Sequence, residues 1–459
     1  MHQIKIKWKE NHYNQLAMKT ISRLSLLAIF TTMSIPLSAQ KAWTLQDCID
    51  YAMTHNISLQ KSGLQIMSSN EDLQQSQAAL LPSLSVSSNQ NVSYRPWPNT
   101  FQQTVVNGIV ETKVNKAFYN GSYSVGANWT VWNGNRNHNQ VKLNEINMER
   151  YETDSISAAL SLEEQINQLF IQIVYTIDNL EVIRHTLEVS KLNEERGAEM
   201  VRIGKMSQAD LYQLTAQHAQ DEYNLVQAES QVRNYKRQLK QLLEITGEEP
   251  FEVSPFQASD AMALAPIPTL SAVYSAAIES RPEIKSAQLA IETSEVQRKI
   301  AKAQSLPTVG LNMSAGTNTS SQSDNAWGKQ IKTNLSLSGG VNIQVPIFDQ
   351  RQSRTASNKA DLQRHQAELD LREKLTSLYS TIENYWIQAQ NSQNQYKAAK
   401  MSTESAQKSY DLLSEQFRLG MKNIVELQEG KSRLLTAQQT ELQSKYMTIL
   451  NIKMLELYR

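Results

Sequence analysis

Two patterns of apolar residues alternate along this chain, and each predicts a different kind of element. Over residues 162–187, apolar residues recur every three or four positions, which predicts a helix that packs along one side. Over residues 122–132 and 331–347, apolar and polar residues alternate one by one, which is typical of a β-strand. Weaker alternation of the same period covers residues 84–94 and 308–317. We therefore expect long helices and four strands.

The placement of proline indicates how long the helices can be. Proline is absent from residues 99–249 and again from residues 347–459. Helices of about 60 residues fit into these stretches, and each would be on the order of 90 Å long at a rise of 1.5 Å per residue.

An internal repeat organises the chain. The matched positions in the two copies are 43–59 with 268–284, Pro82 with Pro307, Trp132 with Phe348, and Gly204 with Gly420. The offset is 225 for the first two matches and 216 for the last two, so one nine-residue deletion in the second copy reconciles them. We expect two tandem repeats, at residues 40–243 and 269–459, joined by a linker at residues 244–268.

Each repeat is expected to hold helices, two strands and a long helical hairpin. The first has strands at 84–94 and 122–132 and a hairpin tip near 202–206. The second has strands at 308–317 and 331–347 and a tip near 418–422. The pair Asn107-Gly108, a β-hairpin signal, predicts a small additional ribbon in the first repeat.

The first 39 residues are expected to be an upstream extension followed by a secretory signal peptide. After Met18, basic residues precede an apolar stretch at 24–33, and Leu37-Ser38-Ala39 forms a small-residue cleavage site. The mature chain would then begin near Gln40. The pattern leaves open whether synthesis starts at Met1 or at Met18.

Composition excludes several classes of function. The 45 Lys+Arg residues balance the 45 Asp+Glu residues, so net charge gives no reason to expect nucleic acid as a partner. Cys48 is the only cysteine, which excludes intrachain disulfides and cysteine-based zinc sites. No run of 18 apolar residues follows the signal peptide, so helical membrane spans are not expected. A membrane crossing would then need strands closed into a barrel.

The four expected strands suit a membrane barrel. Their apolar residues share one face and their polar residues the other, as in a barrel with lipid outside and water inside. Aromatic residues such as Tyr94, Trp129 and Trp132 lie near strand ends, where a membrane interface would place them. Four strands cannot close a barrel alone, so copies must combine, and both dimers and trimers stay possible at this point. The alternation also fits a half-buried sheet in a soluble domain.

Together these features resemble the TolC-like outer-membrane efflux family. The resemblance rests on the Leu-Pro turns at Pro82 and Pro307, the strand exit at residues 346–351, and the Arg-x-Gly turns at 202–204 and 418–420. It implies a mixed fold, in which a membrane β-barrel continues into a long α-helical barrel. In such a homotrimer each chain gives four strands to a shared 12-stranded barrel in the outer membrane of a Gram-negative bacterium, and gives its helices to a periplasmic tunnel.

The resemblance also implies a function and partners. It implies the exit duct of a tripartite efflux or type I secretion system, a passive conduit for substrates. An inner-membrane pump would deliver these substrates through a periplasmic adaptor (membrane fusion) protein. Because the pump largely sets the cargo, the sequence does not distinguish drugs, metals, metabolites and polypeptides.

The resemblance assigns the two Arg-x-Gly turns to the periplasmic tips, where the adaptor docks. Glycine suits the left-handed geometry at a helix end, and Ser207 and Asn423 are N-cap candidates for the returning helices. The same residues also make sense as turns alone. The expected adaptor-docking residues are Arg202, Ile203, Gly204, Lys205, Arg418, Leu419, Gly420 and Met421.

Acidic residues beyond the second tip form the expected periplasmic gate. Glu426 and Glu429 share a helix face, and threefold symmetry would gather their carboxylates into a ring that favours cations. The family carries Asp at the corresponding positions of its tunnel constriction. The resemblance also places an inter-helix polar lock at Asp210 and Lys422, where Lys replaces the usual Arg and cannot form the planar bidentate contact. Exposed charges on a solvated helix are the alternative interpretation.

No catalytic constellation is visible in the sequence. The seven histidines show no metal-ligand spacing, and neither a GxSxG motif nor a glycine-rich phosphate loop occurs. We therefore expect no enzyme, no cofactor and no bound metal. The first alternative to a channel is a soluble periplasmic coiled-coil scaffold without channel activity. A secreted enzyme with a helical body is the second alternative, and the missing constellation argues against it.

Overall fold

The computed structural model describes residues 42–97, 101–105, 109–113, 116–247, 249–256 and 258–459. The expected signal peptide and the Asn107-Gly108 turn lie outside the described residues. All the described residues belong to one unit of the chain.

The helices occur in two matching sets, one in each repeat. Helices α2 (Leu45–His55) and α7 (Leu270–Ser280) have 11 residues each, and α3 (Ile57–Ala78) and α8 (Pro282–Ala303) have 22 each. The long helices α4 (Arg136–Arg202) and α10 (Gln352–Arg418) have 67 residues each. The returning helices are α5 (Gln208–Leu242) and α11 (Ile424–Leu457). All four pairs of helices begin at the expected offsets of 225 or 216, which confirms the tandem duplication.

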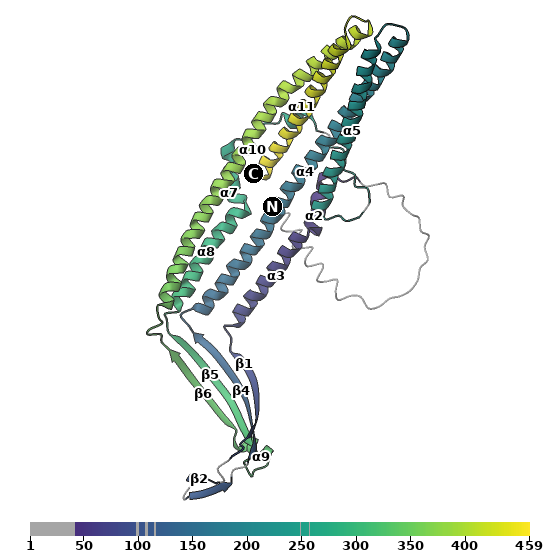
Figure 1. The fold of residues 1–459 in the computed structure, drawn as a ribbon. Helices are drawn as coiled ribbons and strands as arrows, with labels where there is room; N and C mark the ends of the chain where they lie inside the picture. Colours follow the sequence, from purple (N-terminus) through teal and green to yellow (C-terminus); the bar gives the residue numbers. More distant parts are fainter. Residues whose placement is uncertain (1–41, 98–100, 106–108, 114–115, 248, 257) are drawn as a thin grey trace, which may run out of the picture. The chain divides into compact units, whose positions relative to one another are not determined.

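The two long hairpins form the framework of the helical part (Figure 1). Helix α4 packs along α5, and α10 packs along α11. Helix α8 contacts both α4 and α10, while α11 also contacts α4, so the two repeats share one set of packed helices. Among the described residues, we find no helix with the length and apolar character needed to span a membrane.

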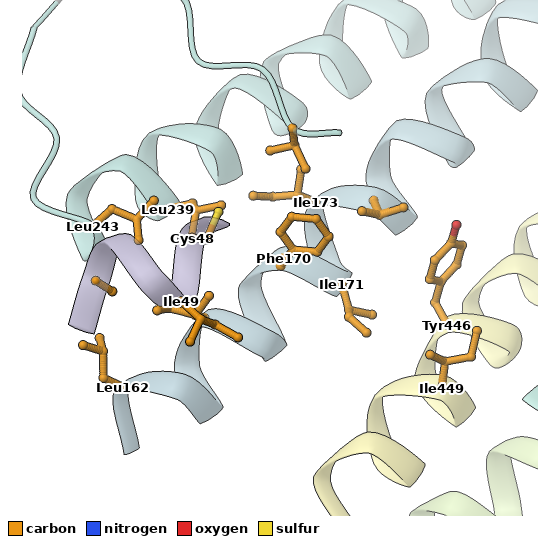
Figure 2. Packing of buried hydrophobic residues seen from close by; sticks show 14 of the residues in the cluster. Cys48, Ile49, Leu162, Phe170, Ile171, Ile173, Leu239, Leu243, Tyr446 and Ile449 are labelled. Carbon is orange, nitrogen blue, oxygen red and sulfur yellow. The ribbon is translucent and has the colours of Figure 1, made fainter. Parts of the chain in front are cut away.

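Apolar side chains from several helices meet in the largest buried cluster (Figure 2). Cys48 of α2 and Phe170 of α4 are almost completely buried there, beside Leu239 of α5. Tyr446 of α11 lies in the same cluster and donates its hydroxyl proton to the Asp178 carboxylate. Since these residues come from both repeats, apolar burial ties the two copies together.

The described part of the linker between the repeats packs against the helices. Val253 forms a parallel bridge with Trp43, and a four-residue helix, α6 (Asp260–Ala263), follows. The Asp260 carboxylate accepts hydrogen bonds from Tyr396 and Lys400, both at 2.6 Å. These contacts hold the linker against α10, so the linker is part of the packed helical core.

Arg281, at the junction of α7 and α8, holds the end of the last helix. Its guanidinium carbon lies 3.9 Å from the centroid of the Tyr458 ring. It also donates to Glu164 at 2.7 Å and to Glu283 at 2.8 Å. Because Glu164 lies in α4, this cluster provides a second link between the repeats.

Four antiparallel strands form one sheet, in the order β1-β4-β5-β6. They are β1 (Ser83–Tyr94), β4 (Ala117–Trp132), β5 (Thr308–Ser320) and β6 (Ser336–Gln344). A separate ribbon pairs β2 (Phe101–Val105) with β3 (Ile109–Lys113), as the hairpin signal predicted. Each repeat therefore gives two strands to the sheet, and its middle pair, β4 with β5, joins the two repeats.

The last strand is shorter than the alternation over residues 331–347 predicted. Helix α9 (Trp327–Thr333) includes the first residues of that stretch. It is held over the end of β5, where Thr317 donates its hydroxyl proton to the carbonyl oxygen of Ile331 at 2.8 Å. A few alternating residues fit one helical turn as well as a strand, and this tertiary contact favours the helix. At the other end, Pro346 has no N–H to extend the ladder.

Candidate functional site

Both hairpin tips turn through a glycine in the left-handed conformation. The φ angle is +73° at Gly204 and +74° at Gly420. In each tip the next residue donates its N–H to a carbonyl of the preceding helix, the Schellman arrangement that ends a helix. These bonds join Lys205 to Met200 at 2.8 Å and Met421 to Gln416 at 2.9 Å. The predicted role of both glycines in the turns is confirmed.

Side-chain caps begin both returning helices, as the sequence predicted. Ser207 accepts a hydrogen bond from the N–H of Asp210 at 3.1 Å. Asn423 accepts one from the N–H of Glu426 at 2.9 Å, and the Glu426 carboxylate accepts from the N–H of Asn423 at 3.2 Å. The second tip therefore has a complete capping box. Because the end of the first helix and the start of the returning helix are both fixed, each tip presents a defined surface.

The tip surface combines exposed apolar side chains with exposed basic ones. Ile203 at the first tip and Leu419 and Met421 at the second each expose at least half of their surface. The arginines of the two turns bond back to their own helices. Their Nε atoms lie 2.8 Å from carboxylates, Arg202 from Glu199 and Arg418 from Glu415. The apolar residues therefore remain available for contact with a partner.

Glu426 is engaged at the start of its own helix. Its Oε1 atom accepts from Lys422 Nζ at 2.6 Å, while Oε2 accepts from the Asn423 N–H. The Lys422 contact, and secondly the Asn423 N–H, lower the pKa of Glu426. Glu429 lies 3.5 Å from Arg433 and is well exposed. Both proposed gate carboxylates reach solvent, but the capping role of Glu426 was not anticipated.

Asp210 and Lys422 make separate contacts in this structure. The Ser207 hydroxyl donates to Asp210 at 2.8 Å, whereas Lys422 forms its ion pair with Glu426. Among the contacts of the described residues, none joins Asp210 to Lys422. An inter-helix lock between them would have to replace these two local contacts.

Sequence reasoning missed a buried ion pair between the two hairpins. Lys431 of α11 and Asp221 of α5 are in direct contact, and they expose only 8% and 3% of their surface. Ser190 of α4 donates to the same carboxylate, and Gln217 donates to its other oxygen at 3.0 Å. Burial is the main influence on Lys431 and lowers its pKa, while the Asp221 contact opposes this shift.

A signal for this ion pair was present in the helical periodicity. Lys431 continues the apolar series of Ile424, Leu427 and Leu434, which are all buried. Asp221 lies seven residues after Leu214, another member of the same cluster. A charged residue at a seam position of a heptad pattern indicates a buried partner of opposite charge.

The described part of the chain offers neither a metal site nor a reactive nucleophile of the kinds expected in enzymes. It contains no group of three or more His, Cys, Asp or Glu side chains placed to hold a metal ion. Cys48 is completely buried, and burial, followed by the charge of Asp47, raises its pKa to about 12. A thiol in that state is unreactive at neutral pH.

Comparison with known protein families agrees with this duplicated architecture. A family model described as "Outer membrane efflux protein" matches the chain over residues 48–244 and 273–454. The chain belongs to the outer membrane efflux protein family. Membership in this family places the protein in the outer membrane of a Gram-negative cell, with a part that extends into the periplasm.

Two curated relatives share part of their length with this member of the family. The chain is 22% identical over 275 residues to the outer membrane efflux protein BepC of Brucella suis, which covers 60% of this chain and 58% of BepC. It is 22% identical over 170 residues to the alkaline protease secretion protein AprF of Pseudomonas aeruginosa, covering 37% and 34%. The matches thus span less than two thirds of either relative.

Solved structures of outer-membrane channels match the fold over nearly the whole chain. The CusC structure superposes with a TM-score of 0.77 at 15% identity, covering 96% of this chain and 99% of CusC. VceC of Vibrio cholerae gives a TM-score of 0.72 at 16% identity, with 90% and 95% covered. This likeness confirms the predicted fold class, that of TolC-like proteins.

Proposed function

We propose that this protein is the exit duct of a tripartite efflux or type I secretion system. Three copies would close a 12-stranded barrel in the outer membrane and continue it as a helical tunnel through the periplasm. An inner-membrane pump would deliver substrates through a periplasmic adaptor. The duct itself is a passive conduit and performs no chemistry.

One observation carries this proposal: the sheet has two free edges and an exposed apolar face. Strands β1 and β6 are the edges. On the apolar face, Leu84, Val86 and Leu337 expose 75%, 78% and 79% of their surface. Such edges and such a face favour aggregation in water. Pairing β1 of one copy with β6 of the next removes the edges, and lipid covers the apolar face.

The hairpin tips are the proposed docking surface for the adaptor. Support comes from their rigid caps and from the exposed Ile203, Leu419 and Met421. An apolar surface on a rigid turn suits a partner that packs helices against it. We assign the periplasmic gate to Glu426 and Glu429. The inter-helix lock would form between Asp210 and Lys422 after each gives up its present local contact.

A soluble periplasmic scaffold is the competing function. Its support is the extent of the paired helices, since α4 and α10 have 67 residues each. The sheet argues against it, because a scaffold gains nothing from an exposed apolar face that water would have to solvate.

Reconstitution of the purified protein separates the two functions. The duct hypothesis expects partitioning into the outer-membrane fraction, trimer bands that dissociate on heating, and single-channel currents in planar bilayers. A water-soluble monomer that forms no pores would contradict the proposed function.

A further inference from the structure

The four-stranded sheet contains no charged residue. Strands β1, β4, β5 and β6 have no Asp, Glu, Lys, Arg or His, although charged residues make up 20% of the chain. On the apolar face, contact with lipid explains the absence of charged residues, because a charge in lipid is costly. It does not account for the opposite face, which lipid would not touch.

The strand register assembles that opposite face, here called the polar face, from small uncharged residues. One row across the sheet is Ser85, Gly126, Ser314 and Ser338, and the next is Ser87, Ser124, Gly316 and Ser336. Further rows contain Asn, Ser, Thr, Gln and Gly. Both repeats therefore contribute the same kind of side chain to one continuous surface.

Hydroxyl groups of the polar face bond mainly within the sheet. The hydroxyls of Ser87 and Ser124 lie 2.7 Å apart, and those of Ser314 and Ser338 are at the same distance. Ser83 donates to the carbonyl oxygen of Asn128 at 3.2 Å. These serine hydroxyls already have partners, and the other groups of the face are uncharged, so a passing solute meets no charged group there that could bind it strongly.

Three glycines on the polar face are not required by the backbone. Gly126, Gly310 and Gly316 are not among the residues with positive φ. A Cβ atom there would meet its nearest neighbour at 3.8, 3.7 and 3.6 Å respectively, which is ordinary contact. An alanine would therefore fit at these three positions, and glycine there keeps the wall thin, which suits a wide bore.

We propose that the polar face lines the bore as a neutral, weakly binding wall that passes hydrated solutes of either sign of charge. This inference rests on the proposed function, because it requires the sheet to be part of a closed, water-filled barrel. Selection by charge then belongs to residues outside the strands, such as Glu426 and Glu429.

Cysteine accessibility tests this wall in the full-length protein in outer-membrane vesicles. Single Ser124→Cys and Ser338→Cys variants place a thiol on the polar face, and their neighbours Val125→Cys and Leu337→Cys place one on the apolar face. Each variant is treated with two membrane-impermeant thiol reagents of similar size, one anionic and one cationic. Native Cys48 stays silent because it is buried and its pKa is raised to about 12.

We expect Ser124→Cys and Ser338→Cys to react with both reagents. Each rate is first divided by the rate of the same reagent with a free thiol in solution. The two corrected rates should then differ by less than about tenfold. A cleft lined by one sign of charge would concentrate the oppositely charged reagent by about that factor or more. Val125→Cys and Leu337→Cys should react with neither reagent. Two variant pairs from different strands guard against a single variant that fails to assemble.

Two results would overturn the inference in distinguishable ways. If the apolar pair stays protected, a bias beyond about tenfold toward one reagent, or no labelling at the polar face, contradicts the neutral wall alone. Equal labelling of both faces shows a sheet surrounded by water, and the proposed duct then fails together with the wall.

Discussion

The side chain of Leu214 in α5 fills the space that Gly197 leaves open in α4. A Cβ atom on Gly197 would lie less than 3.0 Å from Leu214 Cδ1. The second hairpin has the same kind of contact with the residues exchanged, since Leu413 of α10 lies against Gly430 of α11. The offset of 216 places Gly197 on Leu413 and Leu214 on Gly430. The same helix contact is therefore packed in both repeats, but the glycine and the leucine lie on opposite helices.

Exchanging the two residues in the first hairpin should be tolerated better than changing either one. Gly197→Leu alone overpacks the contact and should cost about 1–3 kcal/mol. Leu214→Gly alone leaves a cavity and should cost about 2–5 kcal/mol. The double variant Gly197→Leu/Leu214→Gly recreates the arrangement of the second hairpin and should recover most of this loss. Thermal unfolding followed by circular dichroism measures all three.

The matched control is the reverse exchange in the second hairpin, Leu413→Gly/Gly430→Leu. It should behave in the same way if the two contacts are equivalent. A double variant no more stable than its worse single variant, in both hairpins, would show that the surroundings of the contact differ between repeats.

The buried pair of Lys431 and Asp221 should be far more sensitive to substitution than exposed pairs nearby. Lys431→Met leaves the Asp221 carboxylate buried without a cation and should destabilise the protein by about 3–5 kcal/mol. The double variant Lys431→Met/Asp221→Leu removes both charges and should regain most of that stability, because an apolar pair needs no compensation. Unfolding midpoints in detergent compare the variants.

Arg433 supplies the control for the buried pair. It lies two residues further along α11, and its contact with Glu429 is exposed to solvent. Arg433→Met should therefore change stability by less than about 1 kcal/mol. Equal losses for Lys431→Met and Arg433→Met would mean that burial of the pair does not matter.

The duplication and the hairpin tips could be predicted from sequence because their signals are local. Gly204 and Gly420 indicate left-handed turns, and Ser207 and Asn423 indicate caps, without any knowledge of distant residues. The alternation of apolar and polar residues likewise predicted which residues share each face of a strand. The short end of β6 could not be predicted, since the contact of Thr317 with α9 joins residues that the pattern does not connect.

Contacts between the repeats were the part that sequence reasoning missed. Lys431 meets Asp221 across 210 positions of the chain, and Arg281 meets Glu164 across 117. Periodicity can mark a charged residue on a buried seam but does not name its partner. The capping role of Glu426 is different, because its signal is local: Glu426 lies three residues after the N-cap candidate Asn423, the spacing of a capping box.

Removing the charge of Glu426 should reduce cation preference without disturbing the start of α11. Glutamine at this position can still accept from the N–H of Asn423, so Glu426→Gln keeps the capping box. Reversal potentials in planar bilayers should shift toward zero for Glu426→Gln and further for the double variant with Glu429→Gln. Glu426→Asp, which keeps the charge, is the control and should retain the preference.

The pH dependence of this preference follows from the lowered pKa of Glu426. Its ordinary value is 4.5, and the Lys422 contact lowers the pKa in the folded protein. The carboxylate therefore stays charged as the pH falls through 4.5, and its contribution to stability and to cation preference is lost only at lower pH. Reversal potentials recorded across this range test the sign. Loss of the Glu426-dependent preference above pH 4.5 would contradict it.

Substitutions at Gly420 should separate the shape of the tip from trimer assembly. A Cβ atom there would meet nothing within 4 Å, so any cost comes from the φ angle of +74° alone. Gly420→Val should strain the turn by at least about 1–2 kcal/mol and displace Leu419 and Met421. Gly420→Asn should cost less, because Asn tolerates the left-handed conformation.

If the tips bind an adaptor, Gly420→Val should abolish export in cells while the heat-modifiable trimer still forms, and Gly420→Asn should retain export. Gly204→Val should act like Gly420→Val, since its φ angle of +73° and its open surroundings are the same. The physical basis is that adaptor docking depends on the position of a few apolar side chains, whereas assembly depends on the strands and on the packed helices beyond the turn. Normal export by both valine variants would remove the tips from the docking surface and leave the duct without an assigned contact for its adaptor.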